Sequence, residues 1–129
     1  MFSLGSSNRY YLYRHPTDMR KSFDSLCGVI EEQLNGKPLN GEVYVFINRP
    51  RNRIKLLHWE HGGFVIYYKR LETGTLETPV YDDSNNCFVM SWTELVMMVE
   101  GIRWQKVQRR ERYEPNLPDK KTEEKLMQE

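Results

Sequence analysis

The stretch that decides the fold runs from residue 43 to residue 68 and reads VYVFINRPRNRIKLLHWEHGGFVIYY. It contains three runs rich in β-branched and aromatic residues, 43–47, 54–59 and 64–68, and such runs favour strands. The connections between them are short, whereas a parallel return needs a crossover of about a dozen residues. The stretch therefore predicts three consecutive antiparallel strands. Because residues 43–47 are all apolar, we expect the sheet centre to be covered on both faces, or to present one aromatic contact surface.

One helix is predicted on each side of this stretch. Apolar residues recur at spacings of three and four from Met19 to Leu34, which places them on one stripe of a helix. Thr17 or Asp18 is the expected N-cap of that helix. A capping box at residues 91–94, with serine first and glutamate fourth, predicts the start of the second helix.

Two shorter runs, 10–13 and 87–90, add candidate strands, and the first suits the edge of a sheet. The predicted fold class is α+β, with an antiparallel meander sheet of three to five strands and two helices packed on it. We expect a single domain over residues 9–113. A flexible leader at 1–8 and a charged, disordered tail at 114–129 would flank it.

The composition is typical of a soluble globular protein, with 39% hydrophobic and 29% charged residues in a chain of 129. The net charge of +1 does not by itself indicate nucleic acid. Cys27 and Cys87 do not form a CxxC pair, so we expect both thiols to be reduced and buried. Without a signal peptide or a run of ~20 apolar residues, the chain is expected to be cytoplasmic and not bound to a membrane.

The central stretch also carries a basic turn, with cations at every second position from Arg49 to Lys55 and no acid between Val43 and Trp59. On an extended strand these cations would share one side and would repel each other unless an anion screened them. Phosphate is the natural anion, because the planar arginine fork suits it. The alternative is a solvated hairpin with ordinary surface charge. The cations of this candidate surface are Arg49, Arg51, Arg53, Lys55, Lys69 and Arg70.

A second basic cluster follows the second helix and includes Arg103 and Lys106. It is either an arm that grips the DNA backbone or a set of charges that complements the helix dipole. The aromatic residues of neighbouring strands could stack on bases, although core packing is the more common role of such residues.

Catalysis finds little support in the sequence. Asp82 and Asp83 are the least implausible metal ligands, but they read as part of a polar loop. His58 and His61 lack the further ligands that zinc requires, and no glycine-rich loop has the form that holds a nucleotide. We therefore expect no catalytic residue, no metal and no cofactor.

Four separated motifs, in residues 17–24, 53–59, 63–74 and 100–104, carry a family resemblance. In order and spacing they resemble the accessory protein TnpB, or Orf2-like protein, of the insertion-sequence family sixty-six of bacterial transposable elements. The resemblance covers about residues 9–107. It implies a non-catalytic accessory role in transposition, beside the element's transposase and a second small accessory protein. The cations at matching positions are Arg20, Lys21, Arg53, Lys55, Lys69 and Arg70.

Two functional hypotheses result. In the first, the protein contacts DNA phosphates through the basic hairpin surface. In the alternative, it is a protein–protein adaptor that docks on the transposase without binding DNA, through the aromatic sheet face or the helix around Met97 and Met98.

Overall fold

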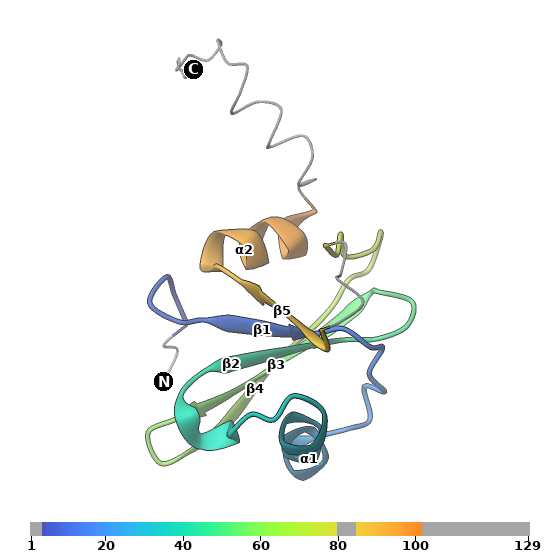
Figure 1. Cartoon of the computed structure of the whole chain (residues 1–129). Coiled ribbons are helices and arrows are strands. Elements are labelled where there is room, and N and C mark those ends of the chain that lie inside the picture. The colour runs from blue at the N-terminus through green and yellow to red at the C-terminus, as the bar shows by residue number, and fades with distance from the viewer. Residues whose placement is uncertain (1–3, 80–84, 102–129) are drawn as a thin grey trace, which may run out of the picture. The chain divides into compact units, whose positions relative to one another are not determined.

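The computed structural model describes residues 4–79 and 85–101 (Figure 1). The chain divides into two compact units, residues 1–96 and 97–129, and the sheet and the clefts discussed below belong to the first. The described strands are β1 (Tyr10–Tyr13), β2 (Val43–Ile47), β3 (Arg53–Glu60), β4 (Gly63–Arg70) and β5 (Cys87–Met90). The described helices are α1 (Phe23–Gln33), a 3-10 turn η1 (Pro38–Asn40) and α2 (Trp92–Glu100).

The five strands form one sheet in the order β4-β3-β2-β1-β5 (Figure 1). β2, β3 and β4 are an antiparallel meander, as predicted. β1, however, runs parallel to β2 and antiparallel to β5. The expectation of a purely antiparallel meander is therefore wrong, and so is the expectation that β1 lies at an edge. The long connection between β1 and β2 contains α1, which supplies the crossover that a parallel pair needs.

Both faces of β2 are covered, and all five of its residues are buried. α1 packs on one face of the sheet (Figure 1). The buried cluster on that face consists of Leu26, Ile30, Tyr44, Phe46 and Leu57. On the other face, the buried ring of Tyr10 lies 5.9 Å from the ring of Trp92. This arrangement confirms the first of the two expectations for the sheet centre.

α1 begins later than the sequence predicts. Its N-cap is Ser22, whose backbone N–H donates a hydrogen bond to Ser25 Oγ over 2.9 Å. Asp18 instead accepts a hydrogen bond from the backbone N–H of Arg20, at 2.9 Å, and closes a turn ahead of the helix. Thr17 and Asp18 are therefore not the N-cap. An aspartate can bond to a backbone N–H two residues on in a turn as readily as it can cap a helix.

α2 begins as predicted. The backbone N–H of Ser91 donates to Glu94 Oε1 at 2.8 Å, and the backbone N–H of Glu94 donates to Ser91 Oγ at 3.2 Å. This reciprocal pair is a capping box. Among the described residues, no helix combines the length and the apolar character that crossing a bilayer demands.

Residues ahead of β1 form a hydrogen-bonded turn. Asn8 N–H donates to the Gly5 carbonyl at 3.2 Å, and Gly5 N–H donates to Asn8 Oδ1 at 3.1 Å. The Tyr10 hydroxyl also donates to the Gly5 carbonyl, at 2.9 Å, and so ties this turn to β1. Residues 1–3 and the tail at 114–129 lie outside the described residues.

The two cysteines are free thiols, and both are half-buried. Burial raises the pKa of Cys27, and the nearby carboxylates of Glu31 and Asp24 raise it further. Burial likewise raises the pKa of Cys87. A raised pKa keeps a thiol protonated and unreactive near neutral pH.

Candidate nucleic-acid interface

Asn48 fixes the turn between β2 and β3. Its Oδ1 accepts hydrogen bonds from the backbone N–H groups of Asn52 and Arg53, both at 3.0 Å. Its Nδ2 donates to Asn52 Oδ1 at 2.8 Å. Arg51 sits in the left-handed region, with φ of 60°, and its N–H donates to the Asn48 carbonyl at 3.0 Å. Such closure by an asparagine side chain is a common turn device, and here it holds the basic residues in a defined arrangement.

The alternating cations do not form one row on a strand. β3 begins at Arg53, so only Arg53 and Lys55 alternate along an extended backbone. Arg49 and Arg51 belong to the turn. The expectation that all four share one side of a strand is therefore wrong, because the asparagine-closed turn interrupts the extended conformation.

Lys55 lies on the inner side of the structure. Only 7% of the residue is exposed, and its ammonium group donates to the carbonyls of Met19 and Lys21, at 2.7 Å each. The same ammonium lies 4.7 Å from the ring centroid of Tyr68, which is a cation–π contact. Lys55 is thus a cross-link between β3 and the segment that leads into α1. The expectation that it points outward with the arginines is wrong.

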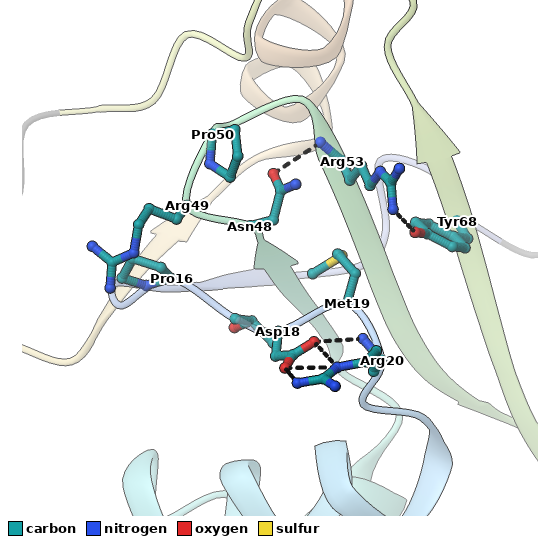
Figure 2. A pocket seen from close by; sticks show the side chains of 10 residues that line it. Pro16, Asp18, Met19, Arg20, Asn48, Arg49, Pro50, Arg53 and Tyr68 are labelled. Atoms are coloured by element: carbon teal, nitrogen blue, oxygen red, sulfur yellow. Dashed lines mark hydrogen bonds and ion pairs between the residues drawn. The ribbon is translucent and has the colours of Figure 1, made fainter.

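An open cleft of about 690 Å³ lies beside the turn (Figure 2). The Thr17 N–H donates to the Ile47 carbonyl at 2.9 Å and so holds the opposite wall against the end of β2. In Figure 2 the Arg53 guanidinium points toward Tyr68, whereas the Arg49 side chain points away from it. The cleft is lined by Pro16, Thr17, Asp18, Met19, Arg20, Asn48, Arg49, Pro50, Arg53 and Tyr68.

The cleft carries a positive balance. Three of its lining residues are arginines and one is an acid, Asp18, so the net charge is 3 − 1 = +2. Asp18 is paired with Arg20, whose Nη2 lies 2.6 Å from Asp18 Oδ2. Hydrogen bonds from the Arg20 side chain and backbone lower the pKa of Asp18 to about 2. Within residues 4–79 and 85–101, Arg49 and Arg53 form no ion pair with a carboxylate.

A neighbouring open cleft of about 320 Å³ shares Arg53 and Tyr68 with the first. It is lined by Arg53, Tyr68, Arg70 and Glu72. Arg53 and Arg70 face each other across β3 and β4. Arg70 forms a salt bridge with Glu72, whose Oε2 lies 2.9 Å from Arg70 Nε, and its charge is therefore partly neutralised. We call this pair of adjoining hollows, which share Arg53 and Tyr68, the basic clefts.

The other cations of the sequence hypothesis lie elsewhere. Arg51 lines neither of the basic clefts but a smaller hollow of about 110 Å³, which Arg49 also borders. Lys69 pairs with Ile54 in the sheet, so its exposed side chain lies on the face opposite to Arg70. Lys21 contributes its carbonyl to Lys55, and its half-buried side chain lines none of these hollows. Arg103 and Lys106 lie outside the described residues.

Sequence reasoning did not assign a role to Asn48 or to the pairing of Asp18 with Arg20. An asparagine at the start of a basic turn was an available signal, since asparagine side chains often close turns. Of the aromatic residues on the neighbouring strands, Tyr44 and Phe46 are buried in the core and Trp59 and Tyr67 are half-buried, but Tyr68 is 51% exposed. The side chain of Met98, named for adaptor docking, is buried.

No metal site is found among the described side chains, since nowhere do three or more His, Cys, Asp or Glu residues gather as ligands would. Asp82 and Asp83, the acids considered for a metal, lie outside the described residues.

Comparison with known proteins gives the family. A family model described as IS66 Orf2 like protein matches residues 8–109, which include all residues of the basic clefts. Two relatives are the proteins y4jC and y4hO of Sinorhizobium fredii, both described as uncharacterized. The first is 26% identical over 102 residues, covering 79% of this chain and 86% of the relative. The second is 29% identical over 104 residues, covering 81% of this chain and 89% of the relative. No solved structure matches the chain. The chain belongs to the family of IS66 Orf2-like proteins, which are accessory proteins of transposition.

Proposed function

We propose that this protein is a non-catalytic, DNA-binding accessory subunit of transposition, and that its basic clefts hold phosphates of the DNA backbone. The observation that carries the proposal is the placement of Arg49 and Arg53. Both line one open cleft, and neither is neutralised by a carboxylate among the described residues. A guanidinium group presents a planar fork of N–H donors that matches phosphate oxygens.

The directions of the two arginine side chains favour a polymer of phosphates over a single small anion. Figure 2 shows the Arg53 side chain directed toward Tyr68 and the Arg49 side chain directed away from it. Two guanidinium groups that point apart suit two phosphates of one strand. Contacts of this kind position a protein on DNA without reading its sequence.

The asparagine-closed turn supports the same function. Because the Asn48 side chain accepts two backbone hydrogen bonds and donates one to the Asn52 side chain, the backbone that carries the flanking cations needs little ordering when DNA binds. In the cell, we place the protein in the cytoplasm with the element's transposase and a second small accessory protein, where it would hold the DNA on which the transposase acts.

A salt titration tests the proposal. Arg49 and Arg53 are both changed to glutamine, and DNA affinity is measured between low and moderate salt. Each lost phosphate contact reduces the slope of log affinity against log salt by about 0.9 on duplex DNA and about 0.7 on a single strand. We therefore expect the double variant to bind more weakly and to show a slope smaller by roughly 1.4 to 1.8.

The matched control changes Lys37 and Lys69 to glutamine. This pair removes the same charge from exposed positions that line none of the basic clefts. If the Arg49 and Arg53 variant behaved like this control, the phosphate site would be wrong. Co-purification with the transposase that survived nuclease treatment and high salt would then favour the adaptor role.

A further inference from the structure

Tyr68 occupies an unusual position for an aromatic residue of this sheet. It is 51% exposed, whereas Tyr44 and Phe46 on the same face are buried under α1. It also lines both of the basic clefts, and Arg53 is the other residue that does so. The ring therefore borders two hollows that each contain arginine.

The ring is held in place from the protein side. The buried ammonium of Lys55 lies 4.7 Å from the ring centroid, and the carbonyls of Met19 and Lys21 fix that ammonium at 2.7 Å each. Arg53 Nη1 lies 3.5 Å from the Tyr68 hydroxyl, at the limit of a hydrogen bond. Lys55 is buried and contacts the ring from the protein interior, while half of the Tyr68 residue is exposed to solvent. A ring that is already ordered loses little conformational entropy when a flat partner covers it.

We propose that Tyr68 stacks on an unpaired base, and that the preferred ligand of the basic clefts is single-stranded DNA. The proposal rests on the function proposed above, because it takes the phosphates to lie in these clefts. In a single strand, the phosphates on the two sides of one base can enter the two hollows while the base covers the ring. A base inside a duplex is stacked on both faces and offers none to a protein side chain, whereas single-strand binders use such aromatic platforms.

Binding to single-stranded and duplex DNA of the same sequence tests this inference. Changing Tyr68 to leucine keeps an apolar side chain but removes the aromatic face. The expected result is a loss of single-strand affinity of roughly 5- to 150-fold, the range found when an aromatic platform is removed. The salt slope should not change, because no charge is lost. Duplex affinity should change far less.

Two further variants serve as controls. Tyr68→Phe removes the hydroxyl and keeps the ring, so it should retain single-strand affinity. Phe23→Leu removes another exposed aromatic ring, which is 43% exposed and lines neither of the basic clefts, and it should have no effect. Equal affinity of Tyr68→Leu and Tyr68→Phe for the single strand would overturn the inference.

Photo-cross-linking gives a readout on the unaltered protein. A single strand that contains 5-iododeoxyuridine should form its protein adduct at Tyr68, and the same strand in a duplex should not. Adducts that map elsewhere, or that form equally from the duplex, would overturn the stacking role. The Arg49 and Arg53 double variant separates the two levels: if it loses affinity and salt slope while Tyr68→Leu binds like wild type, only the stacking fails. If the double variant binds like wild type, the phosphate site fails as well.

Discussion

Changing Lys55 to methionine should strongly destabilise the fold, although a lysine in a basic stretch of sequence would ordinarily be replaceable. Methionine has an unbranched apolar side chain that is similar in shape to the aliphatic part of lysine. The change therefore removes the ammonium group and keeps most of the packing. The carbonyls of Met19 and Lys21, both 2.7 Å from Lys55 Nζ, would lose their shared donor, and the Tyr68 ring would lose its cation.

The magnitude follows from these contacts. A hydrogen bond to a charged group contributes about 1.5–3 kcal/mol, so the two bonds together are worth about 3–6 kcal/mol. Leaving the ammonium out also removes the cost of burying it, which offsets part of this loss. We expect a net decrease in the free energy of unfolding of about 2–4 kcal/mol.

Urea unfolding followed by circular dichroism measures the effect. With a dependence on urea of about 2 kcal/mol per molar, the midpoint should fall by roughly 1–2 M. Lys69→Met is the control, because Lys69 is an exposed lysine on the neighbouring strand and such changes usually stay within about 0.5 kcal/mol. If Lys55→Met also changed the free energy of unfolding by no more than about 0.5 kcal/mol, the reasoning would be refuted. Such a small change would mean that the ammonium is exposed to water in solution.

Two other predictions concern α1 and the cleft. Gly36→Ala should lower the free energy of unfolding by about 1–3 kcal/mol, because the new Cβ would lie 2.7 Å from the Tyr44 hydroxyl oxygen. Gly28 lies inside α1 with open space around it, so Gly28→Ala should raise the free energy of unfolding by about 0.5–1 kcal/mol. Thermal unfolding of the two variants measures these opposite effects. In an NMR titration the Asp18 carboxyl should show a pKa of about 2, and Arg20→Gln should return it toward 3.8. Because the folded-state pKa lies below the unfolded one, this pair stabilises the fold above pH ~4 and the benefit disappears as pH falls through 2. An unchanged pKa in the Arg20 variant would contradict the pairing.

The elements set by local chemistry were predictable from the sequence. The meander follows from short connections between three apolar runs, and the start of α2 follows from the capping box of Ser91 and Glu94. The partners of β1 were not predictable in this way. A run of four aromatic and apolar residues predicts that a strand forms. Whether that strand lies at the edge or in the interior of the sheet depends on segments far along the chain.

The candidate site, too, was predictable only where it depends on local sequence. The sequence correctly places cations in and beside the turn, and Arg49 and Arg53 do line one cleft. Period-two reasoning grouped Lys55 with Arg53, and both do lie on the same face of β3. It could not show that the segment leading into α1 covers Lys55 with the carbonyls of Met19 and Lys21, because a lysine's long stem lets its charge reach a distant partner.

The place of β1 between β2 and β5 has a consequence for the order in which the molecule assembles. Hairpins close quickly because their ends are near in sequence, whereas β1 must find one neighbour beyond α1 and another beyond the whole meander. Because β5 reaches the sheet only through β1, we expect β1 and β5 to join after the meander has formed. The segment that follows β1 supplies Thr17, Asp18 and Arg20 to the cleft wall. A growing or partly unfolded chain would thus present its arginine turn without the opposing wall, and the proposed phosphate site would be complete only once β1 has paired with β2.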